Sequence, residues 1–213
     1  MTGAAWAPGG CPADAVRVGG LVLRRWRADD APDLLAAVES SQEHLRPWMP
    51  WAARYDGASA ADYTQRCETG WAGLEHFDFR ITTDGGDADL PGGQRVLGSA
   101  SLMARLGPGA LEIGYWVRGD WVRLGVATRA AAALTVAGLT LPGVTRIEIW
   151  HDVCNTASAG IPQRLGYRPA GDCCRIPGAH PDGTAAAETG LLSCWVLYRD
   201  ELAGSPAAAI AAT

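Results

Sequence analysis

The chain has 213 residues, 48% of them hydrophobic, which is enough to bury the core of one domain of generous size. A net charge of -5 and an isoelectric point near 5.3 exclude an extended basic surface, so nucleic acid is not expected as the main partner. All eighteen Lys and Arg residues are arginines, and without a lysine no Walker-type phosphate loop can form.

The N-terminal sequence MTGAAWAPGGCPADAV has no basic segment followed by an apolar run, so it does not resemble a signal peptide. No apolar run approaches membrane-spanning length either. We therefore expect a cytoplasmic protein that does not contact a membrane. The six cysteines have no C-x-x-C pair and no metal-ligand spacing, which predicts free thiols and no metal site. Whether the neighbouring Cys173 and Cys174 are redox-active stays open.

The first part of the chain begins with a loose segment. Residues 1–18 are rich in Gly, Ala and Pro and are expected to form a flexible lead-in. Apolar alternation in GLVLRRW predicts a strand over 20–26. The segment ADDAPDLLAAVESSQEHL predicts one helix over 28–45, because an aspartate can cap it and a proline falls in its first turn.

The next segment, RPWMPWAARYDG, cannot form a regular helix because Pro47 and Pro50 remove backbone donors. The two prolines lie beside two tryptophans, Trp48 and Trp51. Tryptophans on an irregular segment can pack over an edge of the core or wall a substrate pocket, and both alternatives stay open.

The remaining elements follow from alternation for strands and from three-to-four-residue spacing for helices. The order of elements indicates one mixed α/β (α+β) domain over 19–202 with about seven strands, followed by a flexible tail over 203–213. Strands are expected over 77–83, 94–104, 110–117, 144–150, about 168–175 and 191–202. Helices are expected over 59–74, about 125–140, and as a short segment from Asn155 or Thr156 that Gly166 ends.

The sequence WVRLGVAT, residues 121–128, lies between a predicted strand and a predicted helix. This arrangement brings backbone N–H groups and the positive end of the helix dipole to one point, which suits a phosphate. Gly125 permits a tight turn and a close approach of the phosphate. Arg123 and Arg129 flank the turn and can supply a cation. Without a ligand the same pattern is an ordinary helix-capping glycine.

The predicted strand ALEIGYWV places Glu112, Gly114 and Trp116 on one face and residues such as Tyr115 and Val117 on the other. A glutamate among apolar neighbours is costly to bury unless it is paired or its pKa is raised. Glu112 is therefore a candidate general base, and a structural salt bridge with an arginine is the alternative.

Three stretches resemble, in the same order, the GCN5-related N-acetyltransferase (GNAT) superfamily and its RimJ/RimL branch. They are LVLRRWRADDAPDL…HLRPWMPW, EIGYWV…GVAT and RIEIWHDVCNTAS…RLGY. The resemblance covers about 21–202 and implies a mostly antiparallel mixed sheet, flanked by helices and splayed between its fourth and fifth strands.

The resemblance also implies an activity. An acetyl group would move from acetyl-CoA, or another acyl from a donor such as succinyl-CoA, to a primary amine by direct attack in a ternary complex. The amine would be a protein N-terminus or a small, antibiotic-like metabolite. A non-catalytic module that binds or senses acyl-CoA is the alternative, and a homodimer is compatible with the sequence.

By this resemblance the pyrophosphate of the cofactor meets a pattern R/Q-x-x-G-x-G/A, which falls on Val122, Gly125 and Ala127. Val122 departs from the pattern, although its backbone N–H is as good a donor as that of Arg. The pantetheine arm is expected along the main chain of the strand before the loop. The whole expected cofactor set is Tyr115, Trp116, Val117, Val122, Arg123, Leu124, Gly125, Val126, Ala127, Thr128 and Asn155.

The sequence NTAS matches the family pattern N-x-x-S at Asn155 and Ser158. Many family members place a tyrosine four residues further on, where it protonates the departing thiolate. Pro162 stands there and has no proton to give, so the resemblance assigns this assistance to the Ser158 hydroxyl, with a helix-starting hydroxyl as the alternative. RimL-type relatives place a base near Glu75 and Asp78, which stay as alternatives to Glu112.

Overall fold

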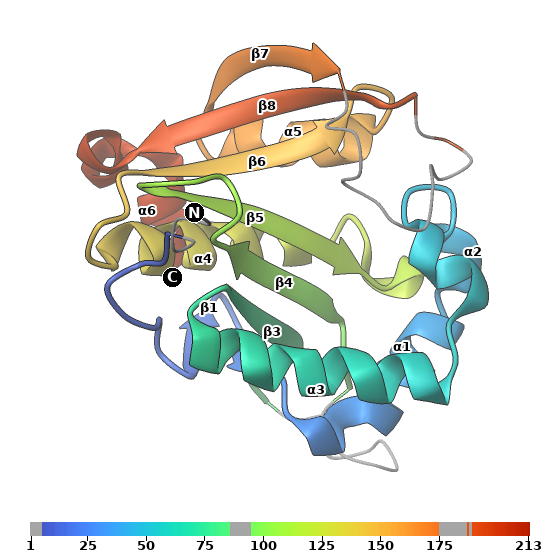
Figure 1. Ribbon diagram of the computed structural model, residues 1–213. Helices are drawn as coiled ribbons and strands as arrows, with labels where there is room; N and C mark the ends of the chain where they lie inside the picture. The colour runs from blue at the N-terminus through green and yellow to red at the C-terminus, as the bar shows by residue number, and fades with distance from the viewer. Residues whose placement is uncertain (1–5, 86–94, 175–186, 188) are drawn as a thin grey trace, which may run out of the picture.

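The computed structural model describes residues 6–85, 95–174, 187 and 189–213. They form an eight-stranded mixed sheet with the strand order β1-β2-β3-β4-β5-β6-β8-β7. All neighbouring strands are antiparallel except β5 and β6, which run parallel. Helices lie on both faces of this sheet (Figure 1). The strands are β1 Ala15–Val18, β2 Leu21–Arg25, β3 His76–Thr83, β4 Gly98–Met103, β5 Ala110–Val117, β6 Arg146–Asp152, β7 Arg168–Cys174 and β8 Leu191–Tyr198.

The helices connect these strands and follow the last one. The α-helices are α1 Ala31–Glu39, α2 Gln42–Leu45, α3 Gly57–Gly73, α4 Val126–Thr140, α5 Thr156–Arg164 and α6 Pro206–Ala211. Four short 3₁₀ turns are η1 Ala28–Asp30, η2 Pro50–Arg54, η3 Gly119–Trp121 and η4 Arg199–Gly204.

Two terminal segments that the structure describes are more regular than the sequence predicted, and the strand near the N-terminus brings the expected sheet of about seven strands to eight. Residues Ala15–Val18 of the expected lead-in pair with β2 as strand β1. In the expected tail, Ser205 caps helix α6, and Ala207 is fully buried in the core that α4 shares. Composition alone predicted flexible segments here, because it does not show that short Ala- and Gly-rich segments can become ordered by packing on the rest of the chain.

The single helix expected over 28–45 was also wrong, because it breaks at two serines. Helix α1 ends at Glu39, and α2 begins after Ser41. The Ser40 hydroxyl donates to the Ala37 carbonyl, a local bond of the kind that competes with continued helix. The break turns the chain toward η2, the 3₁₀ turn that starts at Pro50.

Helix α4 covers one face of the sheet at close range. Its residues Ala130–Ala133 are buried, and Gly138 lies so close to β6 that a Cβ there would meet the Ile147 side chain at 2.8 Å. On the other face, α3 packs on β3, and Trp26 and Cys67 belong to a second buried cluster there. Figure 1 shows α3 in front of the sheet and α4 behind it.

A buried carboxylate joins the second cluster to the sheet. Asp30 accepts hydrogen bonds from Arg24 at 2.7 Å, from Arg80 at 2.6 Å and from the Arg27 amide at 2.8 Å. Burial acts to raise the pKa of Asp30, but the hydrogen bonds from Arg24 and Arg27 and the two arginine charges outweigh it and lower the pKa. The ionised carboxylate therefore stabilises the folded state.

Replacement of this carboxylate provides a test of its contribution. Asp30→Asn is expected to lower the free energy of unfolding at pH 7 by about 3 kcal/mol, because the buried Arg80 and the partly exposed Arg24 lose a shared counter-charge. The folded-state pKa is depressed, so this contribution is present above the unfolded pKa of about 3.9 and is lost as pH falls through the folded value. Urea unfolding at pH 7 and at pH 3 measures both effects. The matched control is Asp33→Asn, since Asp33 also contacts Arg80 but is 44% exposed; equal losses in the two variants would contradict the assignment.

Candidate active site

The site begins where two neighbouring strands separate. Strands β5 and β6 pair only over Ala110–Ile113 and Arg146–Ile149. From Gly114 onward β5 stays paired with β4 but has no partner on its β6 side within the described sheet. Figure 1 shows the two strands diverging toward their C-terminal ends. Backbone donors and acceptors along this edge of β5 are therefore available to a ligand.

Asp152, at the end of β6, holds that strand on the far side of the opening. Its carboxylate accepts hydrogen bonds from the amides of Cys154 at 2.9 Å, Thr189 at 2.7 Å and Gly190 at 3.0 Å. Burial acts to raise the pKa of Asp152, but these hydrogen bonds lower it overall. The carboxylate thus joins β6 to the segment before β8, so these two strands stay together while β5 turns away.

A large hollow, which we call the main cleft, follows this opening. Its volume is about 1690 Å³. It extends from the turn at Gly125, past the splayed strands, to the irregular segment that contains Trp48 and Trp51. Trp51 also packs edge-on against Trp116 of β5, with ring centroids 6.2 Å apart. Trp51 therefore packs on the edge of the core and also lines the cleft, and its role in substrate binding stays a prediction.

At one end of the main cleft lies the turn that the sequence predicted to bind phosphate. Gly125 precedes helix α4 with φ of 76°, in the left-handed region that favours glycine. A Cβ on Gly125 would lie 3.2 Å from the guanidinium of Arg129. Arg123 also has a positive φ, 61°, and lines the cleft together with Arg164. Three arginines therefore surround the N-terminus of α4, where the sequence pattern lacks the usual cation at Val122.

The first turn of α5 places two hydroxyl groups together in the same cleft. Asn155 caps the helix by accepting from the Ser158 amide at 3.1 Å, as the NTAS pattern predicted for a helix start. The Ser158 hydroxyl lies 3.0 Å from the Tyr115 hydroxyl, which reaches it from β5. Burial raises the pKa of Tyr115 to about 12, so this hydroxyl keeps its proton at neutral pH.

On the opposite face of β5, Glu112 is almost fully buried and ion-paired. Its two carboxylate oxygens accept from Nη2 of Arg105 at 2.5 Å and from Nε at 2.8 Å. The salt bridge that the sequence left as an alternative is therefore present. The Arg105 side chain is 55% exposed, so its guanidinium can leave at modest cost when another cation approaches Glu112.

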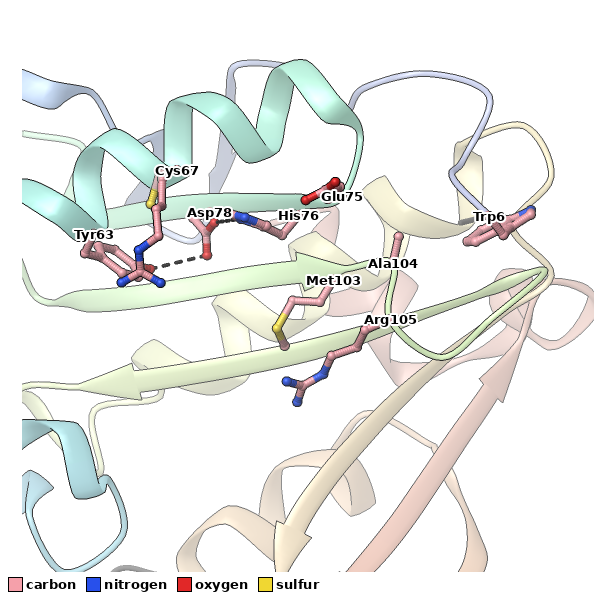
Figure 2. A pocket seen from close by; sticks show the side chains of 10 residues that line it. Trp6, Tyr63, Cys67, Glu75, His76, Asp78, Met103, Ala104 and Arg105 are labelled. Carbon is pink, nitrogen blue, oxygen red and sulfur yellow. Dashed lines mark hydrogen bonds and ion pairs between the residues drawn. The ribbon is translucent and has the colours of Figure 1, made fainter. Parts of the chain in front are cut away.

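Asp78 and Glu75 line a neighbouring hollow, the side pocket, which has a volume of about 450 Å³ (Figure 2). Asp78 accepts hydrogen bonds from Ser101 and from Tyr63, and it contacts Nδ1 of His76. The hydrogen bond with Asp78 raises the pKa of His76. The side pocket shares four lining residues with the main cleft: Tyr63, Arg66, Met103 and Arg105.

Most residues predicted for the site meet in one place, and a few do not. Of the expected cofactor set only Leu124 does not line the main cleft, and it is 56% exposed. Glu112 and Ser158 both line the main cleft, whereas Glu75 and Asp78 do not. Sequence reasoning missed Arg105 and Arg164, and it assigned only the main chain of Tyr115. No short-range pattern signals these partners, because their contacts cross between separate elements.

Two features are absent from the part of the chain that the structure describes. It contains no group of three or more His, Cys, Asp or Glu residues placed to hold a metal ion. None of its helices has the length and apolar character needed to cross a membrane. Cys11, Cys67 and Cys154 are free thiols, while the side chains of Cys173 and Cys174 lie outside what the structure describes.

Comparison with known proteins identifies the family. The model of the acetyltransferase (GNAT) domain family matches residues 20–168, which is more than half of the chain. This chain belongs to the GNAT acetyltransferase family. The family's reaction, transfer of an acetyl group from acetyl-CoA to an amine nitrogen, is the activity of this GNAT protein. A search of curated proteins found no match.

Solved structures share the GNAT fold at low sequence identity. Mycobacterium smegmatis RimJ in complex with CoA-disulfide is 23% identical with a TM-score of 0.76, over 97% of this chain and 97% of that one. RimL, the ribosomal L7/L12 alpha-N-protein acetyltransferase in complex with coenzyme A, is 17% identical with a TM-score of 0.71, over 86% and 97%. The microcin C7 self-immunity acetyltransferase MccE, in complex with acetyl-CoA and AMP, is 15% identical with a TM-score of 0.72, over 91% and 98%. They confirm the predicted fold of the RimJ/RimL type.

The turn at Gly125 gives a prediction about CoA binding. Gly125→Asp is expected to weaken CoA binding at least about 10-fold, because the added carboxylate fills the cradle and repels phosphate. Isothermal titration calorimetry with CoA measures this. Gly20→Asp is the matched control, since Gly20 has a similar φ of 79° but lines neither hollow. Unchanged affinity in the Gly125 variant, or an equal loss in the Gly20 variant, would refute the placement.

Proposed function

We propose that this acetyltransferase modifies the primary amine at the N-terminus of a protein or peptide, by direct attack in a ternary complex. The observation that carries this proposal is the two-sided opening beside Gly114. Hydroxyl groups and the phosphate turn lie on one side of β5, and Glu112 lies on the other. An amine entering from the Glu112 side can thus meet a thioester held from the opposite side.

The residues of the donor side have separate roles in this proposal. Acetyl-CoA supplies the acetyl group. The amides around Gly125, with Arg123 and Arg164, bind its phosphates, and the free edge of β5 pairs with its amide-containing arm. Ser158 donates a hydrogen bond to the sulfur as the carbon–sulfur bond breaks. We propose no covalent acyl-enzyme. Cys154, the cysteine nearest Ser158 in sequence, is exposed, and none of the proposed catalytic residues acts as a base that would activate its thiol.

Glu112 is the favoured proton acceptor on the amine side. It lies at the last paired rows of β5 and β6, next to the opening, whereas Asp78 and Glu75 line the side pocket. The Asp78 carboxylate is already engaged within the protein, by Ser101, Tyr63 and His76. A substrate ammonium can replace Arg105 beside Glu112 and then give up a proton to the carboxylate.

The width of the acceptor side supports a peptide as the amine carrier. Trp48 and Trp51 and the residues shared with the side pocket extend the cleft beyond the reacting amine. The structurally similar RimL is a ribosomal L7/L12 alpha-N-protein acetyltransferase, which has the same kind of acceptor. The second candidate is a small-molecule amine, and the structural similarity to MccE, a self-immunity acetyltransferase, favours it.

An acceptor panel tests the proposed function directly. Purified protein is incubated with acetyl-CoA and either N-terminal peptides or small amines, and thiol release is followed together with product mass. We expect turnover with free N-terminal peptides and none with the same peptides already acetylated. Succinyl-CoA in place of acetyl-CoA tests the alternative donor. Tight CoA binding without turnover of any amine would favour the sensing module instead.

The role of Glu112 makes a second prediction. Glu112→Gln is expected to lower kcat about 10²-fold with little change in the KM for acetyl-CoA, because the amide cannot accept the proton. The loss should shrink as pH rises and more of the amine is already deprotonated. Asp78→Asn is the comparison variant. Loss of kcat in that variant, with full activity in the Glu112 variant, would assign the base to Asp78.

A further inference from the structure

Tyr115 lines the main cleft and makes a side-chain contact that the reaction described above does not use. Its hydroxyl lies 3.0 Å from Ser158 Oγ and 3.4 Å from the Ser158 carbonyl oxygen. It comes from β5, the strand that borders the opening, and reaches across to α5. Within the described part of the structure, Tyr115 is the only hydrogen-bond partner of Ser158 Oγ.

The direction of the hydrogen bond decides what the serine can do. A serine hydroxyl in a helix commonly turns back and donates to a carbonyl of the preceding turn. Such a serine would offer only lone pairs to the cleft, and these would repel a sulfur that is gaining negative charge. The single Tyr115 proton can go to Ser158 Oγ at 3.0 Å or to the Ser158 carbonyl at 3.4 Å, and the shorter contact favours Oγ. When Tyr115 donates to Ser158 Oγ, one lone pair of Oγ is occupied, and the serine O–H is free to point at the cleft.

We propose that Tyr115 is a positioning residue for departure of the CoA thiolate, and that it acts by orienting the Ser158 hydroxyl toward the sulfur. The inference rests on the proposed function. The amine nitrogen bonds to the carbonyl carbon, the carbon–sulfur bond breaks, and its electron pair stays on sulfur. Before the attack, Glu112 takes one proton from the substrate ammonium and releases it to water, and as the amide forms the nitrogen gives its second proton to Glu112, which again releases it to water. The thiolate leaves with a hydrogen bond from Ser158 and takes its own proton from water in the open cleft.

Two properties of Tyr115 suit this role. Burial raises its pKa to about 12, so the hydroxyl remains a donor throughout the pH range in which acetyl transfer is measured. The ring is also fixed, because Tyr115 lies on the central strand β5 and packs against the main core cluster. A rigid donor fixes the serine before the substrate arrives, so no reorganisation is needed as charge develops on the sulfur.

A double-mutant cycle tests the inference. Tyr115→Phe and Ser158→Ala are each expected to lower kcat about 10-fold or more, with the KM for acetyl-CoA changed less than about 2-fold. The double variant should be no slower than Ser158→Ala alone, because the tyrosine acts through the serine. The factor lost in Tyr115→Phe should also be constant between pH 6 and pH 9. Tyr167→Phe is the matched control, since Tyr167 donates or accepts one buried hydrogen bond with Thr135 and lines neither hollow.

The outcomes separate this inference from the proposed function. Wild-type kcat in Tyr115→Phe, or losses that multiply in the double variant, would overturn the role of Tyr115 while acetyl transfer itself stands. Thermal melting of each variant shows whether a lost kcat reflects lost folding, and an equal kcat loss in the Tyr167 variant would also overturn the inference. A wild-type protein that releases no thiol from acetyl-CoA, either to an amine or to water, would overturn the proposed function together with this step.

Discussion

The free edge of β5 is the constraint on which the rest of the site depends. Backbone N–H and C=O groups need partners, and a strand inside a sheet normally finds them on both sides. Here β5 keeps β4 on one side but loses β6 after Ile113. A ligand that offers amide groups can take the place of the missing strand. The extended arm of acetyl-CoA carries such groups, which is why we propose that it pairs with this edge.

This edge persists because β6 is held elsewhere. The buried carboxylate of Asp152 collects three backbone amides from the segments around α5 and β8. Hydrogen bonds from several amides to one carboxylate hold the donor segments together firmly, since each hydrogen bond is charge-assisted. On the other side, Trp116 of β5 packs against Trp51. Contacts of β6 through Asp152 and of β5 through Trp116 therefore hold the two strands on either side of the opening.

The pleat of β5 separates the two halves of the chemistry. Successive side chains of a strand point to opposite faces, so Glu112 and Tyr115 lie on different sides of the same strand. The hydroxyl pair of Tyr115 and Ser158 faces the proposed donor side, and the ion pair of Glu112 and Arg105 faces the proposed amine side. In the proposed mechanism, proton removal from the amine and departure of the thiolate therefore occur on opposite sides of the strand.

Much of this site could be predicted from local sequence. Alternation in ALEIGYWV predicted the face on which Glu112 lies, and the strand-turn-helix pattern predicted the glycine turn before α4, because both features depend on residues close together in the chain. The ends of the chain were mispredicted, because Ala15–Val18 and Pro206–Ala211 are ordered by packing on distant elements. The salt bridge at Glu112 could be established only from the position of Arg105.

The sequence by itself determined the order of most elements, the family, the glycine turn, and the absence of a tyrosine at Pro162, since each is a matter of residue type at a fixed spacing. Only the tertiary structure decided which side chains meet across elements. It brought Tyr115 of β5 to Ser158 of α5, 43 positions apart, and it placed Asp78 with His76 in a separate pocket. The physical reason is that spacing fixes the face on which a side chain lies, whereas its partner depends on how strands and helices pack.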